Sequence, residues 1–344
     1  MAHTPPLYQL DNLTHRYGGQ VVLTIDRLTL SAGAILGLCG PNGSGKSTLL
    51  KLLGFLDRPA GGAIQFEGRP AAPFDERVRA GVALLPQASY LLRRSVYNNV
   101  AYGLRIRKDR RDETARVHHA LATVGLAPQR FAQRPWFALS GGEARRVALA
   151  ARLVLQPRVL LLDEPTTSVD SASAQLIKEA ALQAHRAWGT SLIIAGHDQH
   201  WLAEICHDTL DLFRGRLLGR GKRTLLFGPW HDEADGLTAM PLDDNQRFLA
   251  AGRPKNAPAA VAAIDARHLG LYLAPHLAAA HQCLLEGTVI ALGLEKASQQ
   301  VSVCLAVGQT RLTAYLPREA LADGQFIPGS RAWIAYSPQQ VQWY

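Results

Sequence analysis

A glycine-rich loop set between an apolar run and a helical pattern constrains the fold of this 344-residue chain more than any other feature. Residues 40–47 read GPNGSGKS and match the pattern G-x-x-x-x-G-K-[ST] in full. The preceding run Ala34–Cys39 is continuously apolar, as in a strand covered on both faces, and a helix is expected over Thr48–Leu56. This order predicts an α/β domain with a largely parallel sheet.

The composition of the loop predicts a site for phosphate groups. Its glycines allow backbone N–H groups to surround phosphate oxygens, and the positive end of the following helix points at the same anion. Lys46 would neutralise phosphate charge, and the Ser47 hydroxyl would ligate Mg²⁺. The alternative is a chance glycine-rich turn, which the strand–loop–helix context disfavours.

A second apolar run ends in two carboxylates. The expected strand Val159–Asp163 is followed directly by Glu164. A carboxylate at the end of a buried strand beside a phosphate loop can hold Mg²⁺ through water, which predicts this role for Asp163. Glu164 would point the other way and polarise an attacking water as a general base. Alone, such a pair of carboxylates is often part of a solvated turn. The prediction of a catalytic role therefore depends on the presence of Lys46 in the phosphate loop.

Residues 139–143, LSGGE, open a helix that is expected over Glu143–Leu155. Ser140 suits the N-cap, and Glu143 stands at the capping-box position. One interpretation is a well-capped helix and nothing more. The other is a second helix N-terminus that faces phosphate, and the motif alone leaves both open.

Taken together, these motifs resemble the nucleotide-binding subunit of ABC transporters over about residues 7–227. Further marks of that family occur in the expected order. Tyr17 matches an aromatic residue that stacks on adenine, and Gln87 matches a glutamine that senses Mg²⁺ and the membrane subunit. Asp170 lies in the loop that crosses the dimer seam, and His197 matches the switch histidine at the γ-phosphate.

The resemblance implies an ATPase that works in pairs. Two such domains close head to tail, so this chain would pair with a second nucleotide-binding subunit, most simply its own copy. Each ATP would lie between the phosphate loop of one subunit and residues 140–142 of the other, while Glu164 activates water and His197 steadies the γ-phosphate. The expected ATP contacts are Tyr17, Gly40, Asn42, Gly43, Gly45, Lys46, Ser47, Thr48, Gln87, Ser140, Gly141, Gly142 and Asp170, and the expected Mg²⁺ ligands are Ser47, Gln87 and Asp163.

Three positions depart from the commonest family pattern. Glu143 stands where glutamine is usual and adds negative charge near the phosphates, and Gly196 stands where threonine is common. Cys39 occupies a place usually held by a small or aliphatic residue. We expect activity to survive all three departures, and Cys39 to make it sensitive to thiol reagents.

The organisation predicted along the chain is an ABC ATPase domain, a connection and a small β domain. The ATPase domain is expected over 1–227, with an inserted helical subdomain at about 88–156. Glycine and proline residues break any period over 228–262, which predicts a linker. The β domain is expected over 263–344, with strands at Leu284–Leu294, Gln300–Leu305, Thr310–Leu316 and Arg331–Tyr336.

The C-terminal segment resembles a transport-associated oligobinding (TOBE, Mop-like) domain. The resemblance rests on residues 285–292, 310–317 and 328–335. In the molybdate branch such domains bind the oxyanion, but residues 316–320 read LPREA where a Thr-x-x-Ser element is expected. The sequence therefore favours a role in dimer stabilisation over oxyanion sensing.

Two further segments, 54–59 and 95–104, resemble the tungstate-importer ATPases. The implied function is ATP-driven import of tungstate or molybdate, with sulfate, ferric ion or a polyamine as alternative solutes. The resemblance implies partners in membrane permease subunits and an extracytoplasmic solute-binding protein. An ABC ATPase that acts on a macromolecule is the alternative from another class.

The apolar runs predict where the protein is located, and the charge tests whether it acts on a nucleic acid. We expect no membrane-spanning run and no secretion signal, which predicts a peripheral subunit on the cytoplasmic face of the inner membrane. The net charge is +9, from 37 Lys and Arg against 28 Asp and Glu. The basic run Arg214–Arg223 is interpreted as a hairpin with solvated charges, so no nucleic acid partner is expected. His200 and His207 are interpreted as helix-surface residues and not as metal ligands.

Overall fold

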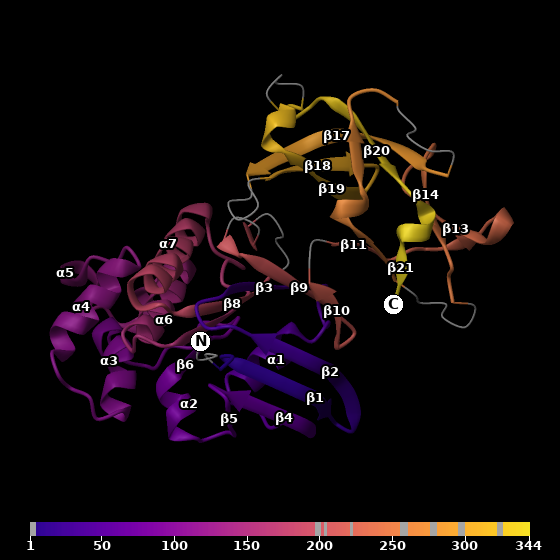
Figure 1. The fold of residues 1–344 in the computed structure, drawn as a ribbon. Coiled ribbons are helices and arrows are strands. Elements are labelled where there is room, and N and C mark those ends of the chain that lie inside the picture. Colours follow the sequence, from indigo (N-terminus) through magenta and orange to yellow (C-terminus); the bar gives the residue numbers. More distant parts are fainter. Residues whose placement is uncertain are drawn as a thin grey trace. The chain divides into compact units, whose positions relative to one another are not determined.

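The computed structural model describes residues 5–196, 201–202, 205–220, 223–254, 261–275, 281–294, 300–321 and 326–344. The chain divides into two compact units, Met1–Gly219 and Arg220–Tyr344 (Figure 1). Among the described residues, no helix has both the length and the apolar character needed to cross a bilayer.

A mixed sheet is the framework of the first unit. In the described part of the chain it has ten strands, in the order β5-β4-β1-β2-β10-β9-β3-β8-β7-β6. Their bounds are β1 (Tyr8–Tyr17), β2 (Gln20–Leu30), β3 (Ile35–Cys39), β4 (Gly61–Phe66), β5 (Arg69–Pro70), β6 (Val82–Leu85), β7 (Val159–Asp163), β8 (Ser191–Ala195), β9 (Asp208–Phe213) and β10 (Arg216–Arg220).

The sheet is parallel in one half and antiparallel in the other. Strands β9, β3, β8, β7 and β6 pair in parallel. The antiparallel strands β1, β2, β4 and β5 depart from the expected largely parallel sheet. The physical reason is local: Gly18 and Gly19 both have positive φ, so they form a tight turn that folds β1 back on β2.

Helices cover both faces of the parallel half. Leu160 and Leu162 of β7 belong to a core shared with the helices between β6 and β8, whereas Val159 and Leu161 belong to a core shared with the helix after β3. Because alternate residues of a strand face opposite sides, burial on both faces explains the uninterrupted apolar run. The helices are α1 (Lys46–Leu53), α2 (Glu76–Gly81), α3 (Val96–Ile106), α4 (Glu113–Thr123), α5 (Pro128–Phe131), α6 (Gly141–Leu153) and α7 (Ser171–Trp188), with a 3₁₀ turn η1 (Trp136–Ala138).

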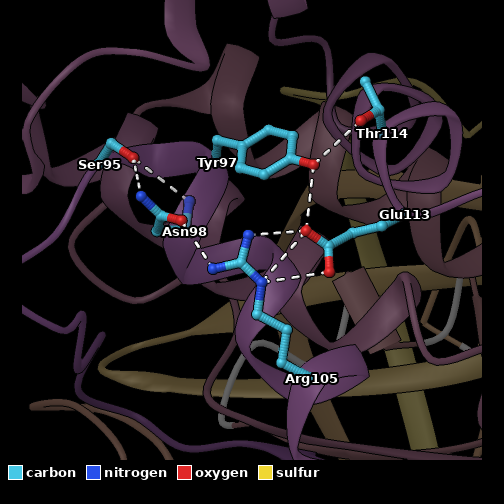
Figure 2. Close-up of polar contacts among 6 residues, drawn as sticks. All are labelled: Ser95, Tyr97, Asn98, Arg105, Glu113 and Thr114. Carbon is cyan, nitrogen blue, oxygen red and sulfur yellow. Dashed lines mark hydrogen bonds and ion pairs between the residues drawn. The ribbon is translucent and has the colours of Figure 1, made fainter. Parts of the chain in front are cut away.

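A polar network fixes α3 against α4. Helices α3, α4 and α7 all pack on α6. Figure 2 shows Arg105 of α3 directing its guanidinium at Glu113 of α4, with Nη2 at 2.7 Å and Nε at 3.1 Å from carboxylate oxygens. Arg105 Nη1 also donates to Asn98, and the Tyr97 hydroxyl donates to Glu113 at 3.2 Å. These bonds hold the two helices in one arrangement.

The second unit is built from short antiparallel strands. Its described residues form a five-stranded sheet, β16-β20-β17-β18-β19, and two three-stranded sheets, β11-β15-β21 and β12-β13-β14. The strands are β11 (Arg223–Leu226), β12 (His231–Asp232), β13 (Leu237–Pro241), β14 (Arg247–Ala251), β15 (Ala262–Asp265), β16 (Gly270–Tyr272), β17 (Cys283–Leu294), β18 (Gln300–Val307), β19 (Thr310–Pro317), β20 (Arg331–Tyr336) and β21 (Gln342–Trp343). Four 3₁₀ turns, η2 (Ala234–Gly236), η3 (Ala266–His268), η4 (Arg318–Leu321) and η5 (Pro338–Gln340), separate some of them.

The segment 228–262, expected to be a linker, is folded over much of its length and carries strands β12 to β14. Phe248 of β14 is fully buried, and its ring stacks on Tyr336 at a centroid distance of 4.4 Å. The Tyr336 hydroxyl accepts a hydrogen bond from Leu249 N at 2.7 Å. The glycine and proline residues of this segment lie mostly at the ends of short strands, where they form turns without preventing the strands.

Candidate functional site

The ends of three neighbouring parallel strands meet at one edge of the sheet. Strand β8 lies between β3 and β7. Past the strand ends, Glu164 N donates to Ala195 O at 2.9 Å, and Gly196 N donates to Leu38 O at 3.1 Å. The loops after β3, β7 and β8 therefore begin side by side, although they are far apart in the sequence.

The loop after β3 lies close against the turn that joins β9 to β10. A Cβ on Gly40 would lie 2.1 Å from Leu212 O, and the φ of Gly40 is 148°, so only glycine fits there. Gly215 N of the turn donates to Ser44 O at 2.9 Å. These contacts fix the backbone of the loop from the side facing β9.

The same loop offers hydrogen-bond donors to an anion. Ser44 Oγ is buried and has no hydrogen-bond partner among the described residues. A Cβ on Gly43 would meet nothing within 4 Å, so the space beside this residue is open. Lys46, 6% exposed, donates from Nζ to Gly40 O at 2.8 Å and to Pro41 O at 3.1 Å. An unpaired hydroxyl and a buried ammonium over an open loop suit the phosphates of a nucleotide.

Two buried carboxylates after β7 lie against this loop. Ser47 Oγ donates to Asp163 Oδ1 at 3.0 Å, and Glu164 Oε1 lies 4.0 Å from Lys46 Nζ. Thr167 Oγ1 donates to Glu164 Oε2 at 3.1 Å. Glu164 adopts a φ of 46°, a conformation that few residues with a side chain adopt. Tertiary structure thus joins the two acidic positions to the phosphate loop.

The surroundings of Asp163 suit a hard cation. Burial raises the pKa of the Asp163 carboxyl above its ordinary value, while the hydrogen bond from Ser47 partly opposes the rise. A hydroxyl and a desolvated carboxylate within hydrogen-bond distance are oxygen ligands of the kind Mg²⁺ prefers. The third expected ligand, Gln87, is exposed. Its backbone carbonyl accepts a hydrogen bond from Arg145, which also donates to the backbone carbonyl of Asp163.

Arg145 is a buried residue of the site that the sequence reasoning missed. It lies on α6, is 2% exposed, and donates from Nη1 to Pro86 O and Gln87 O and from Nη2 to Asp163 O. It also donates from Nη2 to Glu164 O and from Nε to Pro165 O. The available signal was an arginine on the apolar stripe of an amphipathic helix, three residues after Gly142 and four before Leu149.

The residues expected to face phosphate at the start of α6 form a capping box. Ser140 Oγ accepts from Glu143 N at 3.2 Å, and Glu143 Oε2 accepts from Ser140 N at 2.8 Å. Glu143 also lies 3.9 Å from Arg134, which partly balances the charge that distinguishes it from glutamine. The capped-helix interpretation is therefore correct for the single chain, and the backbone of Gly141 remains open.

Asp170 caps the neighbouring helix. Its carboxylate accepts from Ser173 N at 2.8 Å and from Ser173 Oγ at 3.0 Å at the start of α7. A Cβ on Gly142 would lie 2.6 Å from Ser173 Oγ and 3.1 Å from Asp170 Oδ2. Within one chain, the structure thus brings the starts of α6 and α7 together.

Tyr17 lies at the surface near the phosphate loop. It is 44% exposed, and its hydroxyl donates to Asp57 Oδ2 at 2.9 Å. Burial, followed by the contact with Asp57, raises the pKa of Tyr17, whereas a hydrogen bond with Thr48 of α1 lowers it. This places Tyr17 beside α1 with an exposed ring.

The expected histidine positions are only partly described. His197 and His200 lie outside the described residues. His207 packs edge-on against His185 with the ring centroids 6.0 Å apart, and the described residues contain no group of three or more histidine, cysteine, aspartate or glutamate side chains that could hold a metal ion.

The burial of Cys39 argues against its expected sensitivity to thiol reagents. Cys39 is 5% exposed, and burial raises the pKa of its thiol to about 12. The reactive species is the thiolate, which is scarce at neutral pH for such a group, and reagents cannot reach it.

Comparison with known proteins shows which proteins the chain resembles. The family model described as "ABC transporter" matches residues 23–167. The ATP-binding protein TupC of the tungstate uptake system of Peptoclostridium acidaminophilum is 34% identical over 209 residues, which is 60% of this chain and 95% of TupC. The nickel import ATP-binding protein NikO of Rhodobacter capsulatus is 38% identical over 229 residues, 63% of this chain and 89% of NikO.

A solved structure extends the comparison to the fold. The ATP-binding cassette MJ0796, in a dimeric post-hydrolysis state bound to ADP and Pi, matches with a TM-score of 0.56 and 26% identity. The match covers 62% of this chain and 98% of that one. The α/β ATP-binding fold predicted from the sequence is confirmed.

Proposed function

Because this chain belongs to the ABC transporter ATP-binding proteins and is an ATPase of that family, we propose that Glu164 is the general base of its ATP hydrolysis. The observation that carries the assignment is the pair of contacts Ser47–Asp163 at 3.0 Å and Lys46–Glu164 at 4.0 Å. They place one carboxylate beside the hydroxyl expected to ligate Mg²⁺ and the other beside the phosphate-binding lysine.

The roles of the surrounding residues follow from these positions. Lys46 and the backbone N–H groups of the loop 40–45 hold phosphate oxygens, and the exposed ring of Tyr17 stacks on adenine. Ser47, Asp163 and Gln87 would hold Mg²⁺, which would neutralise phosphate charge. Glu164, kept in place by Thr167, accepts a proton from the attacking water.

We further propose that two copies of the chain form the complete site. The open backbone at Gly141 and the capped start of α6 would face the nucleotide of the partner subunit, with Asp170 at the seam. The dimeric state of the similar cassette MJ0796 supports this arrangement. His197 would contact the γ-phosphate.

The test of the general-base assignment is the variant Glu164→Gln, which keeps size and hydrogen bonding but removes the base. We expect ATP binding and ATP-dependent dimerisation to persist while turnover is lost, measured by calorimetry, light scattering and phosphate release. Normal turnover by this variant would disprove the assignment. Lys46→Ala, in contrast, should lose nucleotide binding itself.

A groove on the first unit suits a helix from a membrane permease. It has a volume of 840 Å³ and lies between α3 and the loop that follows Gln87. Its rim carries exposed apolar side chains, Tyr90, Tyr102 and Ile106, beside the cations Arg107 and Lys108. An amphipathic helix with an apolar face and acidic residues complements this surface. A helix bound in the groove would contact the loop that follows Gln87, so binding of the permease could shift the position of Gln87.

The groove assignment predicts that Ile106→Glu reduces recovery of the chain with membranes that carry its permease. Leu56→Glu is the matched control, because Leu56 is also an exposed apolar residue and does not line the groove. Equal recovery of both variants would remove the groove from the docking surface. Recovery with membranes would also support a peripheral association with the membrane.

For the solute, we propose a tungstate or molybdate oxyanion delivered by an extracytoplasmic binding protein. The support is the likeness of segments 54–59 and 95–104 to tungstate-importer ATPases and the similarity to TupC. The similar identity to NikO makes nickel a test case beside sulfate, ferric ion and polyamines.

Elemental analysis decides among these solutes. In cells whose only copy is Glu164→Gln, grown in trace tungstate and molybdate, we expect tungsten or molybdenum to fall while sulfur, iron and nickel stay unchanged. Unchanged tungsten and molybdenum would remove the oxyanion and leave the ATPase. Sedimentation of the chain with ribosomes would instead favour a macromolecular role.

We propose that residues 263–344 form a TOBE-like domain that stabilises the dimer. The segments 285–292 and 310–317 lie in β17 and β19, and most of 328–335 lies in β20. Residues 318–321, which overlap the place of the expected Thr-x-x-Ser element, form the 3₁₀ turn η4. Calorimetric titration of the chain with molybdate tests the sensing alternative, which requires saturable binding outside the ATPase domain.

A further inference from the structure

We propose that Arg145 is the positioning residue that holds Gln87 and Glu164 in register during ATP hydrolysis. The inference rests on the roles proposed above for Gln87 and Glu164. Among the described residues, the hydrogen bonds of Arg145 all go to backbone carbonyl groups, so it acts through the residues that carry them.

The guanidinium joins two loops that no strand pairing joins at that point. Toward the loop after β6 it donates to Pro86 O and, at 2.8 Å, to Gln87 O. Toward the loop after β7 it donates to Asp163 O at 2.8 Å, Glu164 O at 3.1 Å and Pro165 O at 3.2 Å. All N–H groups of the planar side chain are thereby used, which fixes the distance between the two loops.

Burying the guanidinium of Arg145 costs free energy, which indicates a role for this side chain beyond packing. Arg145 is 2% exposed, so its guanidinium has lost nearly all of its contact with water. No ion pair of Arg145 is found in the described part of the chain, so carbonyl dipoles and the nearby charge of Asp163 are its compensation. A neutral apolar residue would avoid the desolvation of the guanidinium, but it would leave the backbone carbonyl groups of both loops without this donor.

Because Arg145 lies on α6, its hydrogen bonds connect the loops after β6 and β7 to the start of that helix. It lies one turn after Gly141 and Gly142, the residues proposed to face the partner's nucleotide. A shift of α6 on dimer closure would therefore move the loop that follows Gln87 and the end of β7 together. One rigid group connects the three parts of the site.

The decisive substitution is Arg145→Lys, which keeps the charge but cannot bind both loops at once. We expect kcat to fall by about 10- to 100-fold, as for a small misplacement of catalytic groups, while the KM for ATP changes by less than about threefold. Arg116→Lys is the matched control: Arg116 Nη2 donates to Val154 O at the end of α6, away from Gln87 and Glu164. It should keep wild-type kcat.

A double-mutant cycle separates positioning from general support of the fold. If Arg145 positions Gln87, then Gln87→Ala should reduce kcat by a smaller factor in the Arg145→Lys background than in the wild type. Multiplicative effects, or an unchanged kcat for Arg145→Lys, would overturn the proposal. Should Arg145→Lys fold poorly by its Tm, the same cycle with Arg145→Gln gives the answer.

A binding readout is independent of turnover. In the Glu164→Gln background, Arg145→Lys should raise the Mg²⁺ concentration for half-maximal ATP binding by about tenfold, because the backbone of two proposed Mg²⁺ ligands loses its support. An unchanged Mg²⁺ dependence contradicts the proposal. Normal turnover by Glu164→Gln alone would instead refute the general base, so the two failures are distinguishable.

Discussion

Ser47 and Asp163, 116 positions apart in the sequence, share a hydrogen bond of 3.0 Å that joins α1 to the end of β7. This bond brings the phosphate loop and the acidic strand end into one site. It also buries Asp163 at 7% exposure, where no described residue forms an ion pair with it. Asp163 is therefore a buried carboxylate whose negative charge has no ion-pair partner among the described residues.

The first prediction is that Asp163→Asn stabilises the free protein while abolishing ATPase activity. Burial raises the pKa of Asp163, so its ionised form destabilises the fold at neutral pH, and asparagine should add about 1 kcal/mol to the free energy of unfolding. Denaturant titration without nucleotide and Mg²⁺ measures this gain.

The sign of the pH dependence follows. The cost of the ionised group is fully present above its raised pKa and disappears below the ordinary value of 3.8, so the gain from Asp163→Asn should shrink as pH falls. Asp109→Asn is the control of opposite sign, because hydrogen bonds from Arg111 and Arg116 lower the pKa of Asp109 to about 2. A gain at Asp109, or none at Asp163, would contradict this account.

The second prediction concerns the two glycines at the start of α6. Gly142→Ala should lower the free energy of unfolding by about 1–3 kcal/mol, because its Cβ would lie 2.6 Å from Ser173 Oγ. Gly141→Ala meets nothing within 4 Å and should keep the wild-type Tm while losing ATPase activity in the dimer. A drop in Tm for Gly141→Ala would argue against an open backbone at the dimer seam.

The third prediction distinguishes the binding lysine from its neighbour on α1. Lys46→Ala should lose ATP binding, whereas Lys51→Ala, which changes an exposed lysine in the last turn of the same helix, should bind normally. Equilibrium binding of a fluorescent ATP analogue measures both. Equal binding by the two variants would mean that charge at position 46 does not hold phosphate.

The fourth prediction is that Cys39 resists alkylation. Because burial raises the pKa of Cys39 to about 12, iodoacetamide at neutral pH should leave it unmodified in the folded protein and modify it in denaturant. Cys283, which is only half-buried, is the internal comparison. Mass spectrometry of the peptides gives both results, and rapid modification of Cys39 would show that the strand β3 opens.

The sequence alone determined those parts of the protein that depend on neighbours along the chain. The runs Val159–Asp163, Ser191–Ala195 and Arg331–Tyr336 are strands with the expected bounds, because burial on each side requires apolar or alternating residues in sequence. The phosphate loop and the capping box at Ser140 were readable for the same reason: their hydrogen bonds lie within a few residues.

Tertiary structure alone decided how distant segments meet. The order of the strands in the first unit brings Ser47 to Asp163 and Lys46 to Glu164. In the second unit, packing against Tyr336 buries Phe248 within a segment that was expected to be a linker. Arg145 is the clearest case, because its partners are backbone carbonyl groups on two other loops. A carbonyl group is common to every residue, so no side-chain pattern marks where an arginine will find several of them together.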